Sequence, residues 1–393
     1  MAIALSKTRF TAGLQCHKLL WWRVHEPTAP ELVPDENQQA IFDAGTRVGQ
    51  VARGYVPGGV LIEGHHFDKK GKLARTQDAL AAGAQIIYEA SFETDRVFSA
   101  IDILERTPEG VRLIEVKSTT KVKDEHIPDI AVQRWVVAGA GLPVVDTQLM
   151  HLNRECRAPD LSNLFERSPV DERVLEALPT VGPEVEAQLT MLEGELPDVP
   201  IGDHCTKPYD CPFLARCWPV LPEHHISTIA RLSPKKRSAL VSLGVVTIHQ
   251  IPDGFELTEI QARQVSAVKD GKPIIEPELK SELAEFEGAR IAFLDFETVG
   301  LPIPVWDGCH PYDAVPVQVS IHVARELPRE AREMPREARE QPRDGIEHFE
   351  WIAEDASDPR PMIAAKVVEA CRGADLVVPF SAGFERKCLA LLA

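Results

Sequence analysis

Three short runs rich in β-branched and apolar residues follow one another in the first third of the chain. Runs of this length, separated by only a few residues, are typical of antiparallel strands joined by tight turns. The three runs are residues 85–92, 97–104 and 111–117, with Pro108, Glu109 and Gly110 as a turn signal. We therefore predict a three-stranded β-meander here.

The sequence after the meander predicts a helix over about 127–137 and a strand over 144–152. Residues 157–200 have helical character, which we expect to be interrupted at Pro169, Pro179, Pro183 and Pro197. Strands mixed with helices in this order indicate an α/β fold, in which a mixed sheet is flanked by helices.

A chain of 393 residues, 44% of them hydrophobic, is long enough for two or three domains. Residues 225–285 carry helix-capping signals, with Ser233 before Pro234 and Thr258 before Gln261, and predict a small helical unit. New strands near 291 and over 315–323 predict a further α/β domain from about 286. Within it, residues 324–344 repeat a proline every seven positions, which excludes a coiled coil and predicts a low-complexity insertion.

No stretch of the sequence approaches the roughly 20 apolar residues needed to span a bilayer, and residues 1–10 lack the features of a signal peptide. We therefore expect a cytoplasmic protein without a membrane partner. The net charge of −17 disfavours general binding to nucleic acid, so any contact with phosphates has to be local. The candidate basic residues, each also typical of solvated surface, are Lys121, Lys123, Lys235, Lys236 and Arg237.

Glu115 and Lys117 lie two residues apart on a predicted strand, so their side chains share one face of the sheet. Asp102 lies in the apolar run of the preceding strand, where a carboxylate without a partner is costly. Two carboxylates and an ammonium group suit hydrolysis of phosphodiesters with Mg²⁺ or Mn²⁺. The alternative is a chance Glu-x-Lys pair on an exposed face.

The segments Ile101-Asp102-Ile103, Leu113 to Ser118 and Gln133-Arg134-Trp135 resemble the motifs of RecB-type PD-(D/E)XK nucleases, which have a restriction-endonuclease-like fold. The resemblance implies that Asp102 and Glu115 bind the metal, that Lys117 assists the nucleophile and that Gln133 orients the site. Glu89, one strand earlier, is a further candidate ligand. Many relatives have a histidine on an early helix, but residues 45–50 contain none.

Eight cysteines in a chain of this kind are better explained by metal binding than by disulfides. Cys205, Cys211 and Cys217 are evenly spaced, and Cys16 is the candidate for a fourth ligand. The pattern resembles RecB-family nucleases with a cluster, including the CRISPR adaptation nuclease, which implies a structural 4Fe-4S cluster. Zinc is the competing metal. The other cysteines, which we expect to be buried thiols, are Cys156, Cys309, Cys371 and Cys388.

Two further segments carry weaker resemblances. Residues 225–285 resemble a helix-hairpin-helix unit, which binds phosphates through backbone amides, although a plain helical spacer fits as well. Asp295-Phe-Glu297-Thr resembles the first motif of DEDD exonucleases, which have an RNase H-like fold. Residues 380–385 look like their second motif, with Glu385 where an aspartate is commoner. The later motifs do not follow, so we expect a partial domain with a candidate second metal site and little exonuclease activity.

Together these observations predict three parts: a PD-(D/E)XK nuclease domain closed by an iron-sulfur cluster (1–224), a helix-hairpin-helix-like unit (225–285) and a partial RNase H-like domain (286–393). This order resembles a family of bacterial proteins. We expect a metal-dependent deoxyribonuclease acting on single strands or ends, in DNA repair, processing or defence, and RNA remains open as a substrate. The alternatives are a catalytically weak iron-sulfur scaffold that binds nucleic acid, and a zinc-stabilised interaction protein.

Overall fold

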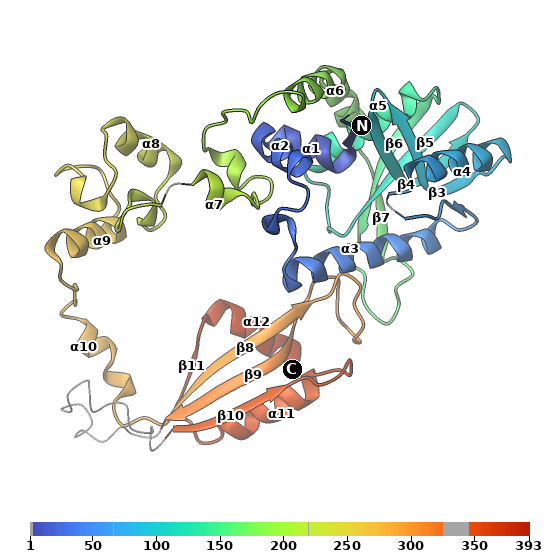
Figure 1. The fold of residues 1–393 in the computed structure, drawn as a ribbon. Coiled ribbons are helices and arrows are strands. Elements are labelled where there is room, and N and C mark those ends of the chain that lie inside the picture. The colour runs from blue at the N-terminus through green and yellow to red at the C-terminus, as the bar shows by residue number, and fades with distance from the viewer. Residues whose placement is uncertain (1–2, 66, 219, 325–345) are drawn as a thin grey trace.

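The computed structural model describes residues 3–65, 67–218, 220–324 and 346–393. Its elements form a large sheet with helices, a small helical unit and a smaller second sheet (Figure 1). The predicted α/β class is therefore confirmed. The predicted low-complexity insertion lies, from residue 325 onward, outside the described residues. No helix in the described part of the chain is long and apolar enough to cross a membrane.

The large sheet has seven strands, ordered β2-β3-β4-β5-β6-β7, with β1 paired to β4. The predicted meander β3–β5 is antiparallel, β5 and β6 are parallel, and β7, which the sequence did not predict, is antiparallel to β6. The strands are β1 (Leu5–Ser6), β2 (Val60–Leu61), β3 (Ile86–Thr94), β4 (Val97–Thr107), β5 (Gly110–Lys117), β6 (Val144–Leu152) and β7 (Phe165–Pro169).

Helices cover both faces of the large sheet. The neighbours Leu113 and Ile114 on β5 point to opposite faces. Leu113 packs in a core with residues of α1, α5 and α6, whereas Ile114 packs with Ala52 and Val56 from α3 and its end. The helices of this part are α1 (Lys7–Gln15), α2 (His17–His25), α3 (Glu36–Tyr55), α4 (Lys69–Ala81), α5 (His126–Gly139) and α6 (Asp171–Leu192).

The expected interruption of the helix at Pro179 and Pro183 is wrong, because α6 continues through both residues. Each internal proline costs about 3 kcal/mol through a lost hydrogen bond and a clash. The apolar residues of α6 recur at helical spacing and are buried in the main core, and burial of each contributes about 1.5–3 kcal/mol. The buried apolar residues are Val174, Val181, Val185, Leu189 and Leu192.

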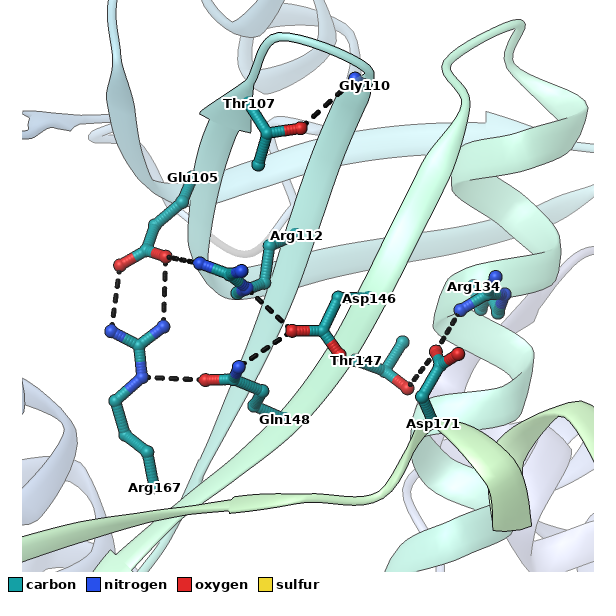
Figure 2. A network of polar contacts seen from close by, with 10 residues as sticks. All are labelled: Glu105, Thr107, Gly110, Arg112, Arg134, Asp146, Thr147, Gln148, Arg167 and Asp171. Carbon is teal, nitrogen blue, oxygen red and sulfur yellow. Dashed lines mark hydrogen bonds and ion pairs between the residues drawn. The ribbon is translucent and has the colours of Figure 1, made fainter.

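A polar network joins four strands of the large sheet near the turn between β4 and β5 (Figure 2). Arg167 on β7 binds Glu105 on β4 through two hydrogen bonds of 3.0 and 2.9 Å. Arg112 on β5 donates to the same carboxylate at 3.0 Å and to Asp146 on β6 at 2.7 Å. Beside it, Asp171 at the start of α6 accepts from Arg134 and Thr147, which ties α5 and β6 to α6 (Figure 2).

The helical unit contains the predicted caps. The side chain of Ser233 accepts from Lys236 N, Pro234 is the first residue of α8, and Thr258 and Gln261 form a capping box. Gly244, with φ of +72°, follows the end of α8. The α-helices of the unit are α8 (Pro234–Ser242), α9 (Glu259–Asp270) and α10 (Leu279–Glu282), preceded by α7 (Leu214–Cys217), and the unit stands apart from the large sheet (Figure 1).

The second sheet has the order β10-β9-β8-β11, in which β8–β10 are antiparallel and β11 is parallel to β8. Its core is formed with two helices that lie along one face (Figure 1). The elements are β8 (Ile291–Gly300), β9 (Ala314–Ala324), β10 (Ile346–Ile352), α11 (Arg360–Cys371), β11 (Leu376–Pro379) and α12 (Ala382–Leu392).

The loop between β8 and β9 connects the second sheet to the first part of the chain. Backbone hydrogen bonds join Ala158 N to Cys309 O at 3.0 Å and Gly308 N to Ala158 O at 2.9 Å. Ile303 packs on the apolar cluster around Cys156. The loop between β8 and β9 is thus in direct contact with the segment between β6 and β7.

Candidate functional site

The strands β4 and β5 separate at the position of Asp102. Their pairing runs from Thr107–Gly110 to Ile103–Ile114 and stops there. Beyond this point Asp102 Oδ2 accepts a hydrogen bond of 2.7 Å from Val116 N, while β1 pairs with the other end of β4 at Val97 and Phe98. The fold therefore opens a gap between two core strands and places a carboxylate in it.

Glu115 is the centre of the polar cluster at this gap, and its side chain is only 3% exposed. Its Oε1 lies 2.7 Å from Lys117 Nζ and 2.7 Å from Lys7 Nζ. Its Oε2 accepts a hydrogen bond of 2.7 Å from Gln133 on α5. Asp129 on α5 binds Lys117 and lies 3.6 Å from Lys7 Nζ.

The structure brings Glu115, Lys117 and Gln133 together, as the sequence analysis expected, with Asp102 on the adjacent strand. Lys7 and Asp129 were missed. Asp129 lies four residues before Gln133, so helical periodicity places both on one face of α5 and would have identified it. Lys7 carries no such signal, because its place follows from the pairing of β1 with β4, two strands that are distant in the sequence.

Glu89 lies opposite Asp102 on β3. Its neighbours Tyr88 and Ala90 pair with Ile103 and Ile101, and Glu89 itself has φ of +58°, in the left-handed region. Such backbone strain in a non-glycine residue persists only where the surrounding structure fixes it, and it is frequent at functional sites. The Glu89 carboxylate is bound by Arg53 of α3 at 2.9 Å.

The charges of the cluster shift its pKa values in opposite directions. Burial raises the pKa of Asp102 to about 8, Glu115 and Glu89 add to this shift, and Lys7 opposes it. Burial acts to raise the pKa of Glu115 too, but the ammonium groups of Lys117 and Lys7 hold that pKa well below its usual value. The neighbouring carboxyl groups of Asp102 and Glu115 thus differ in how readily they ionise.

The four predicted cysteine ligands, Cys16, Cys205, Cys211 and Cys217, line one cavity. Burial raises the pKa of the Cys211 thiol, and the neighbouring sulfur groups of Cys16, Cys217 and Cys205 contribute to this shift. Both ends of the first part of the chain therefore meet at one group of thiols. The described cysteines are all free.

Polar contacts hold the two cysteine-bearing segments together. Gln15, the last residue of α1, donates to the carbonyl oxygens of His204 at 2.8 Å and Tyr209 at 2.7 Å. Arg216 binds Glu31 and Glu26 and lies over the Phe213 ring at 4.7 Å. Of the cysteines expected to be buried thiols, Cys156, Cys309 and Cys388 are buried, and Cys371 is half-buried.

The candidate residues of the second sheet lie on opposite sides of it. Asp295 and Glu297 share the exposed face of β8. Glu385 on α12 is buried, and its Oε2 accepts from Ser381 N at 3.0 Å. Its Oε1 is buried without a hydrogen-bond partner among the described atoms.

The candidate basic residues are spread over two regions. Lys121 and Lys123 are exposed in the segment that follows β5, close in sequence to Lys117. Lys235 and Arg237 are exposed and Lys236 is half-buried at the start of α8, in the unit that stands apart from the large sheet (Figure 1). The two groups therefore do not form one continuous patch.

Within residues 3–65, 67–218, 220–324 and 346–393, no group of three or more His, Cys, Asp or Glu side chains is arranged so that it could hold a metal ion. At the strand gap, lysine and arginine side chains engage Glu115, Asp129 and Glu89. Residues 292–393 match the family described as "Domain of unknown function (DUF2779)", which corresponds to the second sheet and its helices. Among curated proteins, no match to the chain was found.

Proposed function

We propose that the chain is a divalent-metal-dependent nuclease that hydrolyses phosphodiester bonds of DNA at the gap between β4 and β5. The observation that carries the proposal is the buried carboxylate of Glu115, held by Lys117 and Gln133 next to Asp102. A buried carboxylate surrounded by cations is costly as a structural device alone, because each charge loses its hydration. Such a site is a functional candidate with a physical reason.

The order of elements supports the restriction-endonuclease-like form of the fold. Asp102 and the pair Glu115 and Lys117 lie on adjacent antiparallel strands of the meander, α5 with Gln133 follows, and β6 is parallel to β5. This is the arrangement that the resemblance to RecB-type nucleases implies. The candidate residues then gather where β4 and β5 separate.

The donor chemistry of the gap suits Mg²⁺ or Mn²⁺, which prefer carboxylate oxygens. Asp102 and Glu115 would hold the ion, and Glu89 could add a third oxygen. When bound, the metal polarises a phosphate and lowers the pKa of water. The protein's own part is to orient Glu115 through Gln133 and to hold the ammonium group of Lys117 beside the reacting phosphate.

The thiols of Cys16, Cys205, Cys211 and Cys217 around one cavity support a 4Fe-4S cluster that joins the two ends of the nuclease domain. Four thiolates also suit zinc, so zinc is the competing ligand. For the second sheet, the order β10-β9-β8-β11 and the exposed Asp295 and Glu297 support a partial RNase H-like domain.

Cleavage of end-labelled single-stranded and double-stranded DNA with Mn²⁺ or Mg²⁺ tests the proposal, using anaerobically purified protein. Asp102→Ala and Lys117→Ala should each abolish cleavage, because each removes one part of the site. The double variant Asp295→Ala, Glu297→Ala is the matched control for metal ligands elsewhere. Wild-type protein without cleavage would favour the iron-sulfur scaffold instead, and cleavage that only the control variant removes would place the active site in the second sheet.

A further inference from the structure

Lys7 is a second ammonium group at the proposed active site, and it comes from the far N-terminal end of the chain. It is the first residue of α1, directly after Ser6, whose side chain caps the helix by accepting from Arg9 N. Leu5 is fully buried and pairs with Val97 on β4. The backbone before Lys7 is thus fixed on the strand that carries Asp102, and the backbone after it is fixed as the capped start of α1.

Lys7 and Lys117 share the same carboxylate oxygens. Both Nζ atoms lie 2.7 Å from Glu115 Oε1, and both contact Asp129 Oδ2, with Lys7 at 3.6 Å. A carboxylate oxygen offers about two lone-pair positions. Oε1 of Glu115 is therefore fully used by the two lysines.

The remaining acceptor positions lie on other oxygens. Glu115 Oε2 has one described donor, Gln133, and keeps a second position. In the described part of the chain, the hydrogen bond of Asp102 uses Oδ2 and leaves Oδ1 open. Glu115 can thus offer Oε2 to a metal ion beside Asp102, whereas its Oε1 is closed to a second ion at the roughly 3.5–4 Å spacing of two-metal sites.

The balance of charge at the gap also favours one divalent ion over two. Glu89 is paired with Arg53. The remaining carboxylates, Asp102, Glu115 and Asp129, face the two ammonium groups of Lys7 and Lys117. With all three ionised, this leaves one uncompensated negative charge, which suits one divalent ion next to a phosphate and disfavours two in a half-buried site.

We propose that Lys7 is a positioning residue that restricts the site to one divalent metal ion, because its ammonium group occupies the Glu115 oxygen that a second ion would need. This inference rests on the proposed nuclease function and goes further by assigning its metal stoichiometry. It also gives Lys7 a role, because a neutral residue at this position would leave a position on Glu115 Oε1 free for a second ion.

Mn²⁺ titration followed by electron paramagnetic resonance tests the inference without measuring activity. The full chain is purified anaerobically in an Asp295→Ala, Glu297→Ala background, which removes the candidate ligands of the second sheet. We expect one bound Mn²⁺ with Lys7 present. In Lys7→Met, which keeps the length of the side chain, we expect a second Mn²⁺ and the spectrum of a spin-coupled pair.

Two variants serve as controls. Lys7→Arg keeps the charge and should bind one ion, and Arg9→Met removes a charge from the same helix without touching the carboxylates and should also bind one. The inference would be overturned by two coupled ions with Lys7 in place, or by a single ion with unchanged affinity in a folded Lys7→Met variant. Either result would leave the nuclease proposal standing. Absence of Mn²⁺ binding in all four proteins would overturn both.

Discussion

The hydroxyl group of Tyr312 donates a hydrogen bond to the backbone carbonyl of Ser118, the residue that directly follows Lys117. Tyr312 lies in the loop between β8 and β9 and has φ of +64°, a conformation that few residues other than glycine adopt. Strain of this kind persists only where surrounding contacts fix it. The second sheet is therefore held against the end of the strand that carries Glu115 and Lys117.

Replacement of Tyr312 by phenylalanine should loosen this contact. The hydrogen bond that it removes is worth about 0.5–1.5 kcal/mol, so the loop should open more often while the large sheet stays folded. Hydrogen-deuterium exchange by mass spectrometry should show faster exchange over residues 301–313 and unchanged exchange in β5. Tyr209→Phe, at a 62% exposed tyrosine, is the control. Equal exchange in Tyr312→Phe and wild type would contradict a role for this contact.

The cysteine centre makes a prediction about metal content. Anaerobically purified protein should be coloured and contain about four iron and four sulfide per chain, as a 4Fe-4S cluster requires. Cys211→Ser should lose the iron and lower the melting temperature, because the cavity then has three thiols. Cys371→Ser, at a half-buried cysteine on α11, should keep both. Colourless protein that contains zinc would exclude the iron-sulfur proposal.

The raised pKa of Asp102 links metal binding to pH. Because its pKa is about 8 in the folded chain and 3.8 ordinarily, the folded metal-free protein binds more protons between these values. Its stability should therefore fall as the pH rises through this range. A metal ion needs the ionised carboxylate, so Mn²⁺ should raise the melting temperature more at about pH 9 than at about pH 6.

Asp102→Asn is the matched variant for this measurement. It keeps the size of the side chain but has no proton to lose, so the pH-dependent part of the Mn²⁺ effect should disappear. If Mn²⁺ stabilised wild type and Asp102→Asn equally at both pH values, Asp102 would not be a ligand.

Local patterns were sufficient to predict the strands of the meander, the helix α5 and the caps Ser233 and Thr258, because these depend on neighbouring residues. The face shared by Glu115 and Lys117 follows from the alternation of a strand, and it too was predictable. The continuous helix α6 was not predictable. Its internal prolines predict an interruption, and the burial of its apolar face, which compensates their cost, depends on packing against the rest of the core.

The role of Lys7 depends on contacts distant in the sequence. Nothing near Lys7 distinguishes it from a surface lysine, and the contact with Glu115 spans 108 positions of the chain. The strained conformation of Glu89 was equally invisible, because nothing in the residues around it predicts a positive φ within a strand. Sequence patterns specify elements and faces, but they do not specify which distant side chains converge.

The basic start of α8 makes a prediction about DNA binding. Lys235→Gln together with Arg237→Gln should weaken binding to DNA. The slope of the logarithm of affinity against the logarithm of salt concentration should become shallower by about 0.9 for each phosphate that the variant no longer neutralises. Lys70→Gln with Lys72→Gln on α4 is the charge-matched control. Fluorescence anisotropy over a range of salt concentrations measures both. An unchanged slope would favour a plain helical spacer.

The network of Figure 2 makes a prediction about stability that is independent of the nuclease proposal. Glu105 accepts from Arg167 and Arg112, and its side chain is 16% exposed. Glu105→Gln removes the only carboxylate that Arg167 is described to bind and one of the two that Arg112 binds, and should lower the free energy of unfolding by about 1–2 kcal/mol. Glu193→Gln, which breaks the exposed pair with Arg96, should change it by less than about 0.5 kcal/mol.

The network also determines how the stability difference between wild type and Glu105→Gln depends on pH. Burial acts to raise the pKa of Glu105, but Arg167 and Arg112 hold it below its usual value of 4.5. The unfolded chain therefore takes up a proton at Glu105 before the folded chain does, and the stabilising contribution is lost as the pH falls below about 4.5. Urea unfolding should show a difference between wild type and Glu105→Gln that is constant near neutral pH and shrinks in acid. A difference that stayed constant in acid would mean that the charge of Glu105 does not contribute.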